Sequence, residues 1–266
     1  MLDMGLKIIH IISKLVRKSF KRNNVISKFT TVEQLRAIMP GLLYGYLSEE
    51  EMPNSLELLS PPPEIASRAY EIDLEYAKKA VESNDKVRFL KAASDADLSF
   101  PIAAKCFGAV LEIEIDEQNT PKLYTLMRRV MTDAGLSTYA AKNYYNRVRP
   151  FVVNSSKTCT PDQEEILRKV GSFPSGHAAV GCAWSLILIE IFPHNKEAIL
   201  KRGYDFGESR VVCNAHWHSD VEMGRIMGKA TVECLFANQS FREDLVGVKE
   251  EMFEVLAAVR NKKDVN

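Results

Sequence analysis

The chain has 266 residues, which is long enough for one large domain or two small ones with a substantial buried core. Its 35 lysine and arginine residues equal its 35 aspartate and glutamate residues, so the net charge is zero, which argues against a dedicated nucleic-acid-binding protein. The five cysteines follow no CxxC or zinc-ligand spacing, and their odd number leaves at least one thiol free or intermolecular.

Residues 1–25 place basic side chains among apolar ones, with Asp3 as their single acid. This pattern is typical of an amphipathic helix that lies on an anionic membrane surface, and a frayed leader or a misassigned start codon is the alternative. Lys14 interrupts the apolar run and no A-x-A cleavage site follows, so the segment is a poor signal peptide. We therefore assign residues 1–28 to a basic amphipathic leader or atypical signal segment, and residues 29–266 to one domain.

Helix signals recur along the rest of the chain, and strand signals are weak. A capping-box spacing at Thr30 and Thr31 opens a short helix to about Met39, and residues 41–60 read as a loop. Apolar periodicity and capping residues then predict helices at 64–83, 86–93, 101–115, 120–135, 137–149, 176–192, 195–213, 216–237 and 240–260. The loop at 151–175, with a possible short helix at 162–170, is long enough to suggest a functional role. The pattern predicts a single all-α domain, in which no segment reaches the roughly 18–20 apolar residues that span a bilayer.

Lys142 and Arg149, in the stretch KNYYNRVRP, lie seven residues apart. This is about two helical turns, so both cations are expected on one face of a helix that Pro150 ends. Two cations without acidic partners repel each other unless an anion lies between them. A solvated basic face is the simpler interpretation of this stretch taken alone.

Residues 171–177, GSFPSGH, lead directly into a predicted helix. The first N–H groups of a helix are unpaired and, with the helix dipole, form a ready anion site. Gly176 would let an anion approach the backbone closely, the Ser175 hydroxyl would add a donor, and His177 would face the same anion and could carry a proton. A well-capped core helix is the alternative interpretation.

His216 and Asp220, in ESRVVCNAHWHSD, are four residues apart and would share one helix face. The carboxylate can then orient the imidazole and leave its other nitrogen free as a base, nucleophile or metal ligand. Arg210 lies about 120° away around an ideal helix, so it serves the same pocket only if the helix breaks, with Cys213-Asn214 as the expected break. A salt-bridged surface helix explains the stretch without any chemistry.

Together these stretches resemble the signature of the type 2 phosphatidic acid phosphatase superfamily, K-x6-R-P, P-S-G-H and S-R-x5-H-x3-D. Its members include bacterial class A non-specific acid phosphatases, membrane lipid phosphatases and vanadium haloperoxidases. The fixed positions are all present, as Lys142, Arg149, Pro150, Pro174, Ser175, Gly176, His177, Ser209, Arg210, His216 and Asp220. The stretch SLELLSPPPE at 55–64 is also similar to the class A enzymes, so the resemblance covers about residues 40–240.

The resemblance implies a metal-independent acid phosphatase that acts on small phosphate monoesters without a cofactor. It implies that His216, oriented by Asp220, forms a phosphohistidine, and that His177 serves as acid and then as base. The phosphate-binding residues would be Lys142, Arg149, Ser175, Gly176 and Arg210. Three cations match the three equatorial oxygens of a transferring phosphoryl group, and one protonated and one neutral histidine favour activity on the acid side of neutrality. The resemblance also implies a homodimer or larger assembly and a periplasmic location.

Two alternatives stay open. A haloperoxidase would hold vanadate permanently between the same phosphate-binding residues, here called the cradle, although this chain is short for that class. A non-catalytic, membrane-associated anion-binding protein would use the basic residues 1–25, but anion binding alone needs no pair like His216 and Asp220.

Overall fold

The computed structural model describes residues 31–38 and 41–263, and every regular element in these two ranges is helical. The prediction of an all-α fold is therefore confirmed, while the predicted leader at 1–28 lies outside the described residues. None of the described helices combines the length and the apolar character that crossing a bilayer requires. The elements are α2 (Val32–Ile38), α3 (Ser55–Leu58), α4 (Arg68–Glu82), α5 (Lys86–Asp95), α6 (Ile102–Leu111), α7 (Pro121–Leu136), α8 (Tyr139–Tyr145), α9 (Pro150–Val153), η1 (Pro161–Gln163), α10 (Glu164–Leu167), α11 (Gly176–Ile191), η2 (Pro193–Asn195), α12 (Lys196–Val212), α13 (His218–Ala237) and α14 (Gln239–Lys263).

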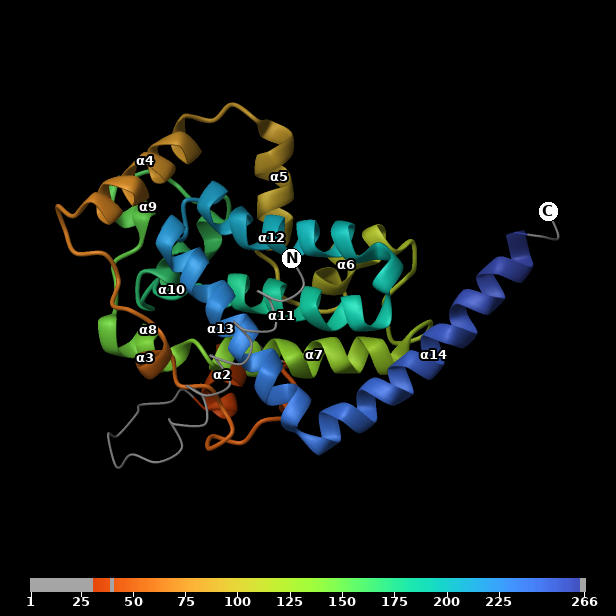
Figure 1. Cartoon of the computed structure of the whole chain (residues 1–266). Helices are drawn as coiled ribbons and strands as arrows, with labels where there is room; N and C mark the ends of the chain where they lie inside the picture. The colour runs from red at the N-terminus through yellow and green to blue at the C-terminus, as the bar shows by residue number, and fades with distance from the viewer. Residues whose placement is uncertain (1–30, 39–40, 264–266) are drawn as a thin grey trace, which may run out of the picture.

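Helix α11 forms the centre of the molecule and packs against α7, α12 and α13 (Figure 1). Its middle is apolar on all sides, as expected of a helix that is covered all round. Trp184 on α11 is 1% exposed, and its indole Nε1 donates a hydrogen bond of 2.9 Å to the carbonyl of Met127 on α7. The ring of Phe206 on α12 lies 5.8 Å from the Trp184 ring, so these aromatic residues join three helices in one core.

Two glycines bring α12 and α13 close to α11. A Cβ atom at Gly203 on α12 would collide with the Ser185 side chain, and a Cβ atom at Gly224 on α13 would collide with the backbone oxygen of Ser175. A larger residue at either position would push the helices apart. The glycine at 224 thus keeps the start of α13 against the start of α11, which is where the candidate site lies.

The long loop predicted at 151–175 contains α9 at its start and, further on, η1 and α10. A disulfide joins Cys159 in this loop to Cys213 at the end of α12, with the two Cα atoms 4.8 Å apart. The side-chain amides of Asn154 and Asn214 add a reciprocal pair of hydrogen bonds of 2.9 and 3.0 Å. The loop is therefore fastened to the segment that connects α12 and α13.

The end of the molecule opposite this loop is marked by α14, whose C-terminal part extends away from the other helices (Figure 1). Phe253 and Val246 on this helix are exposed. The start of α14, by contrast, is buried through Phe241 and Leu245.

Candidate active site

The sequence places Lys142 and Arg149 on one helix face, and this part of the prediction is wrong. Helix α8 ends at Tyr145, Asn146 takes a left-handed conformation with φ of 41°, and Arg149 is the N-cap of α9. The two cations still lie in the same region, since each donates to the backbone oxygen of Gly171 at 3.3 Å. A turn of the chain, and not helical periodicity, brings them together.

Lys142 is 4% exposed, and its ammonium group binds the loop that precedes α11. Its Nζ atom donates to the backbone oxygen of Pro174 at 2.6 Å, and it lies 3.3 and 3.5 Å from those of Gly171 and Ser172. These contacts fix the ammonium group beneath the segment that begins α11.

The Arg149 guanidinium is also 4% exposed and lies between the 151–175 loop and His216. Its Nη1 atom lies 3.1 Å from Nε2 of His216. The other hydrogen bonds of this guanidinium go to backbone oxygens, those of Leu167, Val170, Gly171 and Ala215. Because arginine only donates, Nε2 of His216 is the acceptor, and the ring proton must be on Nδ1.

Helix α11 begins at Gly176, as the GSFPSGH stretch predicts. Ser175 is its N-cap, and its hydroxyl accepts a hydrogen bond of 3.3 Å from the N–H of Ala178. The N–H groups of Gly176 and His177 occupy the first two helical positions, which have no intrahelical partner. The Ser175 N–H donates to the Asp220 backbone oxygen at 2.9 Å, so the starts of α11 and α13 are joined directly.

Arg210 lies in the last turn of α12 and is 1% exposed. Its Nε and Nη1 atoms are buried and have no hydrogen-bond partner. Helix α12 ends two residues later, and Asn214 has a φ of 56°, so the predicted helix break at Cys213-Asn214 is confirmed. Buried guanidinium nitrogens without acceptors are costly, so these two atoms are suited to bind an anion.

His216 and Asp220 meet, although not on a shared helix face. Helix α13 begins at His218, so the predicted start at residue 216 is wrong, and Asp220 occupies the N3 position while His216 precedes the helix. The Asp220 Oδ2 atom accepts from the Trp217 N–H at 2.9 Å and lies 3.3 Å from Nδ1 of His216. A capping interaction therefore aims the carboxylate at the imidazole.

Positive charge accumulates in this site. Burial, followed by the charge of Arg149, lowers the pKa of Lys142 to about 7, and burial lowers the pKa of Arg149 to about 10 and that of Arg210 to about 9. Burial also lowers the pKa of both histidines well below the usual value, with Arg210 adding to the effect on His177 and Arg149 to the effect on His216. An anion of two charges would relieve this excess.

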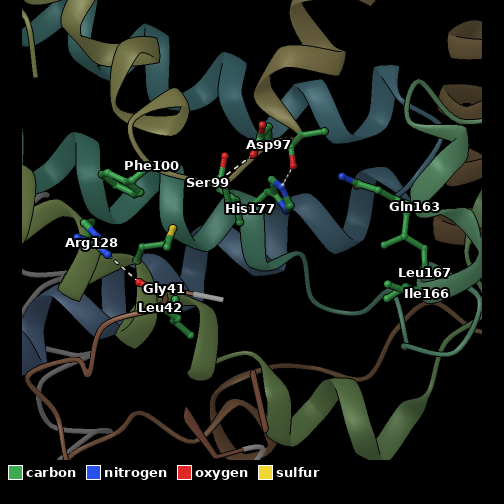
Figure 2. Close-up of a pocket in the computed structure, with 13 residues that line it drawn as sticks. Gly41, Leu42, Asp97, Ser99, Phe100, Arg128, Gln163, Ile166, Leu167 and His177 are labelled. Atoms are coloured by element: carbon green, nitrogen blue, oxygen red, sulfur yellow. Dashed lines mark hydrogen bonds between the residues drawn. The ribbon is translucent and has the colours of Figure 1, made fainter. Parts of the chain in front are cut away.

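A cavity of about 480 Å³ lies beside these residues, and His177 is the member of the predicted set that lines it. His177 is partly buried, and its Nε2 atom lies 3.1 Å from the Ala96 backbone oxygen (Figure 2). The wall is largely apolar and comes from the α5–α6 connection, α7, the chain before α3 and the segment around α10: Gly41, Leu42, Ala96, Asp97, Leu98, Ser99, Phe100, Arg128, Met131, Gln163, Ile166 and Leu167. Leu167 belongs to this wall and also binds Arg149 through its carbonyl, so the cavity adjoins the buried cations.

The sequence interpretation missed Arg147, which contacts Asp220, and Asp73, which contacts Arg147. Arg147 donates from Nη1 to Oδ1 of Asp220 at 2.6 Å and from Nη2 to Asp73 on α4 at 2.7 Å. Arg147 lies inside the KNYYNRVRP stretch and could have been suspected there. Asp73 is one of several acids on an amphipathic helix, and nothing in the sequence distinguishes it.

Ser209, a fixed position of the signature, binds residues of α5 and α12 and none of the predicted phosphate-binding side chains in the described hydrogen bonds. Its hydroxyl donates to Asp95 at 2.6 Å and accepts from Arg88 at 3.0 Å. Asp95 also forms a buried ion pair with Arg202. Ser209 therefore contributes to the packing of α5 against α12.

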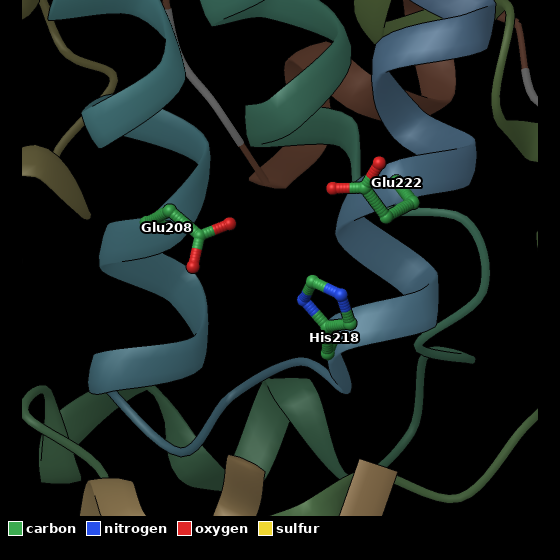
Figure 3. A group of neighbouring side chains, drawn as sticks. All are labelled: Glu208, His218 and Glu222. Atoms are coloured by element: carbon green, nitrogen blue, oxygen red, sulfur yellow. The ribbon is translucent and has the colours of Figure 1, made fainter. Parts of the chain in front are cut away.

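His218 also lies outside the set, beside Glu208 and Glu222 (Figure 3). Sequence spacing did not suggest this group, whose possible metal-binding atoms lie within 4.8 Å of one another. Arg225 forms ion pairs with both carboxylates, and the His218 ring stacks on Tyr76 at 4.0 Å. The guanidinium thus already pairs with both acids and offsets part of their charge.

Comparison with known proteins agrees with these features. The model of the PAP2 superfamily matches residues 124–243, a range that includes all the predicted site residues. The chain is 37% identical over 229 residues to a non-specific acid phosphatase of Salmonella typhimurium, covering 86% of this chain and 88% of the relative. It is 38% identical over 231 residues to that of Providencia stuartii (84% and 93%), and 33% identical over 207 residues to an acid phosphatase of Zymomonas mobilis (78% and 78%). The chain therefore belongs to the PAP2 superfamily and, within it, to the family of the non-specific acid phosphatases.

Proposed function

We propose that the protein is an acid phosphatase that hydrolyses small phosphate monoesters, with His216 as the nucleophile and without a metal ion. The observation that carries this proposal is the buried guanidinium of Arg210, whose Nε and Nη1 atoms lack partners in a site that also holds Lys142, Arg149 and an oriented imidazole. A phosphoryl group supplies the acceptors and the negative charge that these cations lack.

Substrate binding begins with a change of partner at Arg149. In the structure its Nη1 atom lies 3.1 Å from Nε2 of His216. A bound phosphoryl group takes over this donor and leaves Nε2 with a free lone pair directed at phosphorus. Lys142 and Arg210 bind the other oxygens, and the N–H groups at the start of α11 complete the cradle.

Transfer then proceeds in two balanced steps. Nε2 of His216 forms a bond to phosphorus while the bond to the leaving oxygen breaks, and His177 gives its proton to that oxygen. Asp220 accepts the Nδ1 hydrogen bond and stabilises the positive ring. Water then attacks the phosphohistidine, gives a proton to His177 and releases inorganic phosphate, which regenerates neutral His216.

The leaving group occupies the cavity that His177 lines. Its volume of about 480 Å³ lies within the range of roughly 300–1,000 Å³ that is usual for small-molecule sites. The largely apolar wall favours compact esters with an aromatic or aliphatic body. In the proposed arrangement the ester oxygen would lie next to His177, the proposed proton donor.

The first prediction concerns metal dependence. Because side chains supply all the positive charge, turnover of p-nitrophenyl phosphate is expected to be unchanged by EDTA. Orthovanadate is expected to inhibit, because it occupies the cradle with the geometry of the transferring group. Loss of activity in chelator, restored by a divalent ion, would show a metallophosphatase instead. Bromide oxidation by hydrogen peroxide after vanadate loading would show a haloperoxidase.

The second prediction concerns pH. The pKa of His177 is lowered by burial and then by Arg210, so in the free enzyme the proton required for catalysis is lost at low pH. Arg149 also lowers this pKa. A bound phosphate dianion opposes the charges of Arg210 and Arg149 and therefore raises the pKa of His177. The alkaline limb of kcat is therefore expected at higher pH than the alkaline limb of kcat/KM, measured over about pH 4–9. In a His177→Asn variant the alkaline limb of kcat should disappear, and limbs that coincide in the parent protein would exclude this role of His177.

A periplasmic location and a homo-oligomeric state remain part of this proposal, as does membrane-surface contact through residues 1–25. The Cys159–Cys213 disulfide supports an oxidising compartment, since such bonds are rare in the cytosol. Cell fractionation and light scattering of the purified protein test these points.

A further inference from the structure

A chain of buried charges extends from His216 to α4, well beyond the residues assigned to catalysis. Asp220 is fully buried, Arg147 is 9% exposed at its side chain, and Asp73 is 1% exposed. Arg147 donates to Asp220 at 2.6 Å and to Asp73 at 2.7 Å, and its Nη1 atom also donates to the Ser219 hydroxyl at 2.8 Å. Ser219 in turn donates to Asp73 through its N–H at 2.8 Å and its hydroxyl at 2.6 Å.

We propose that Arg147 is a positioning residue for the nucleophile, because it fixes the Asp220 carboxylate that orients His216, and that Asp73 fixes Arg147 in turn. This inference rests on the proposed role of His216. It assigns a part in the reaction to α4, which lies outside the three signature stretches.

The division of contacts on Asp220 supports this role. Oδ2 accepts from the Trp217 N–H and faces Nδ1 of His216, whereas Oδ1 accepts from Arg147. With both oxygens held, the carboxylate cannot rotate away from the imidazole. The Arg147 guanidinium also lies over the Trp217 ring, 5.3 Å from its centre, and the Trp217 indole donates to the Val148 backbone oxygen at 2.8 Å. The arginine is thus fixed on several sides.

Charge balance gives Arg147 a second effect. The charged groups that act on His216 are Lys142 on α8, Arg149 at α9, Arg210 on α12 and Asp220 on α13, and His177 on α11 faces it. Arg147 neutralises part of the Asp220 charge, and Asp73 neutralises part of the Arg147 charge. Removing Arg147 would leave Asp220 more effective in attracting a proton to His216, and removing the Asp73 charge would do the opposite.

The test uses the full-length protein with Arg147→Met, Arg147→Lys and Asp73→Asn. In Arg147→Met we expect kcat for p-nitrophenyl phosphate to fall about 10–100-fold with KM within about threefold, as for other groups that orient a functional side chain. The acid limb of kcat should move to higher pH, since His216 is protonated more readily. Arg147→Lys should recover part of kcat and part of the original pH of the acid limb. The lysine restores the positive charge but not the two parallel donors of the guanidinium. Asp73→Asn should move the limb to lower pH.

Arg225→Gln is the matched control. Arg225 is 12% exposed, lies on α13 and pairs with two carboxylates, those of Glu208 and Glu222, but none of its contacts reaches His216. Its kcat and acid limb are expected to stay within about twofold of the parent, since it lacks any contact with the reacting groups. Inorganic phosphate affinity, measured by calorimetry, should be retained in all variants, because Arg147 does not contact the phosphate-binding residues.

The outcomes separate this inference from the proposed function. If the parent enzyme works through His216 but Arg147→Met and Arg147→Lys keep its kcat and its pH limbs, the positioning role is wrong. The same conclusion follows if Arg147→Met and Asp73→Asn shift the acid limb in the same direction, as general loosening would. If a His216 variant kept near-parental activity, the proposed function itself would be overturned. Should Arg147→Met fail to fold, Arg147→Lys and Asp73→Asn decide the question.

Discussion

Replacing His216 with asparagine is expected to lower kcat for p-nitrophenyl phosphate by at least about 10³-fold, as loss of a nucleophile does in other enzymes. The amide keeps a polar group of similar size beside Asp220 and Arg149, but its nitrogen has no basic lone pair to attack phosphorus. Helical content, measured by circular dichroism, should not change, since His216 precedes α13 and its contact with the end of α12, to the Arg210 carbonyl, is made by the backbone N–H and not by the side chain. His216→Ala should behave in the same way.

His194→Asn provides the control, because His194 is exposed in η2 and belongs to no part of the site. Rapid quenching of the parent enzyme with labelled substrate should yield protein-bound phosphate that is stable in alkali and lost in acid. The asparagine variant should yield none. Near-parental turnover in either His216 variant would show that another group attacks phosphorus.

Replacing Arg210 with methionine is expected to raise stability and to remove most of the activity. The guanidinium is 1% exposed and leaves Nε and Nη1 without partners, so it is a buried, poorly solvated charge. Methionine fills a similar volume without that cost. Each kcal/mol gained should raise Tm by about 2–4 °C in a domain of this general size. Loss of one donor to the transition state should lower kcat about 10²–10³-fold.

Arg202→Met is the matched control on the same helix. Arg202 is 6% exposed, but it forms an ion pair with the buried Asp95 and donates to the Cys106 backbone oxygen at 2.9 Å. Its removal leaves Asp95 without its cation and should lower Tm. Inorganic phosphate should raise the Tm of the parent protein more than that of Arg210→Met, since the variant binds the anion more weakly. A lower Tm for Arg210→Met in phosphate-free buffer would contradict our account of this residue.

The sequence predicted which residues lie near one another better than it predicted the reasons for their proximity. Capping residues and apolar periodicity located most helices, and the signature named the residues that surround the buried charge. Lys142 and Arg149 meet because the chain turns at Asn146, and His216 meets Asp220 because the carboxylate caps α13. Both arrangements depend on local dihedral angles that residue spacing does not reveal.

Contacts between helices that are far apart in the chain could not be predicted from capping residues, apolar periodicity or the signature. Asp73 and Asp220 are 147 positions apart in the chain and share Arg147 only because α4 packs on the start of α13. Glu208, His218 and Glu222 likewise meet across two helices. Such contacts follow from how glycines such as Gly224 allow the helices to approach one another, which a single sequence does not specify.

The Cys159–Cys213 bond spans 54 residues, and the enclosed segment contains Ser175, His177 and Arg210. In the chain-entropy description, closing a loop of this length stabilises a protein by about 4 kcal/mol. A polypeptide held in a reducing cytoplasm would lack this stabilisation. The oxidation state of this pair would therefore set how firmly the segment that carries these three residues is held.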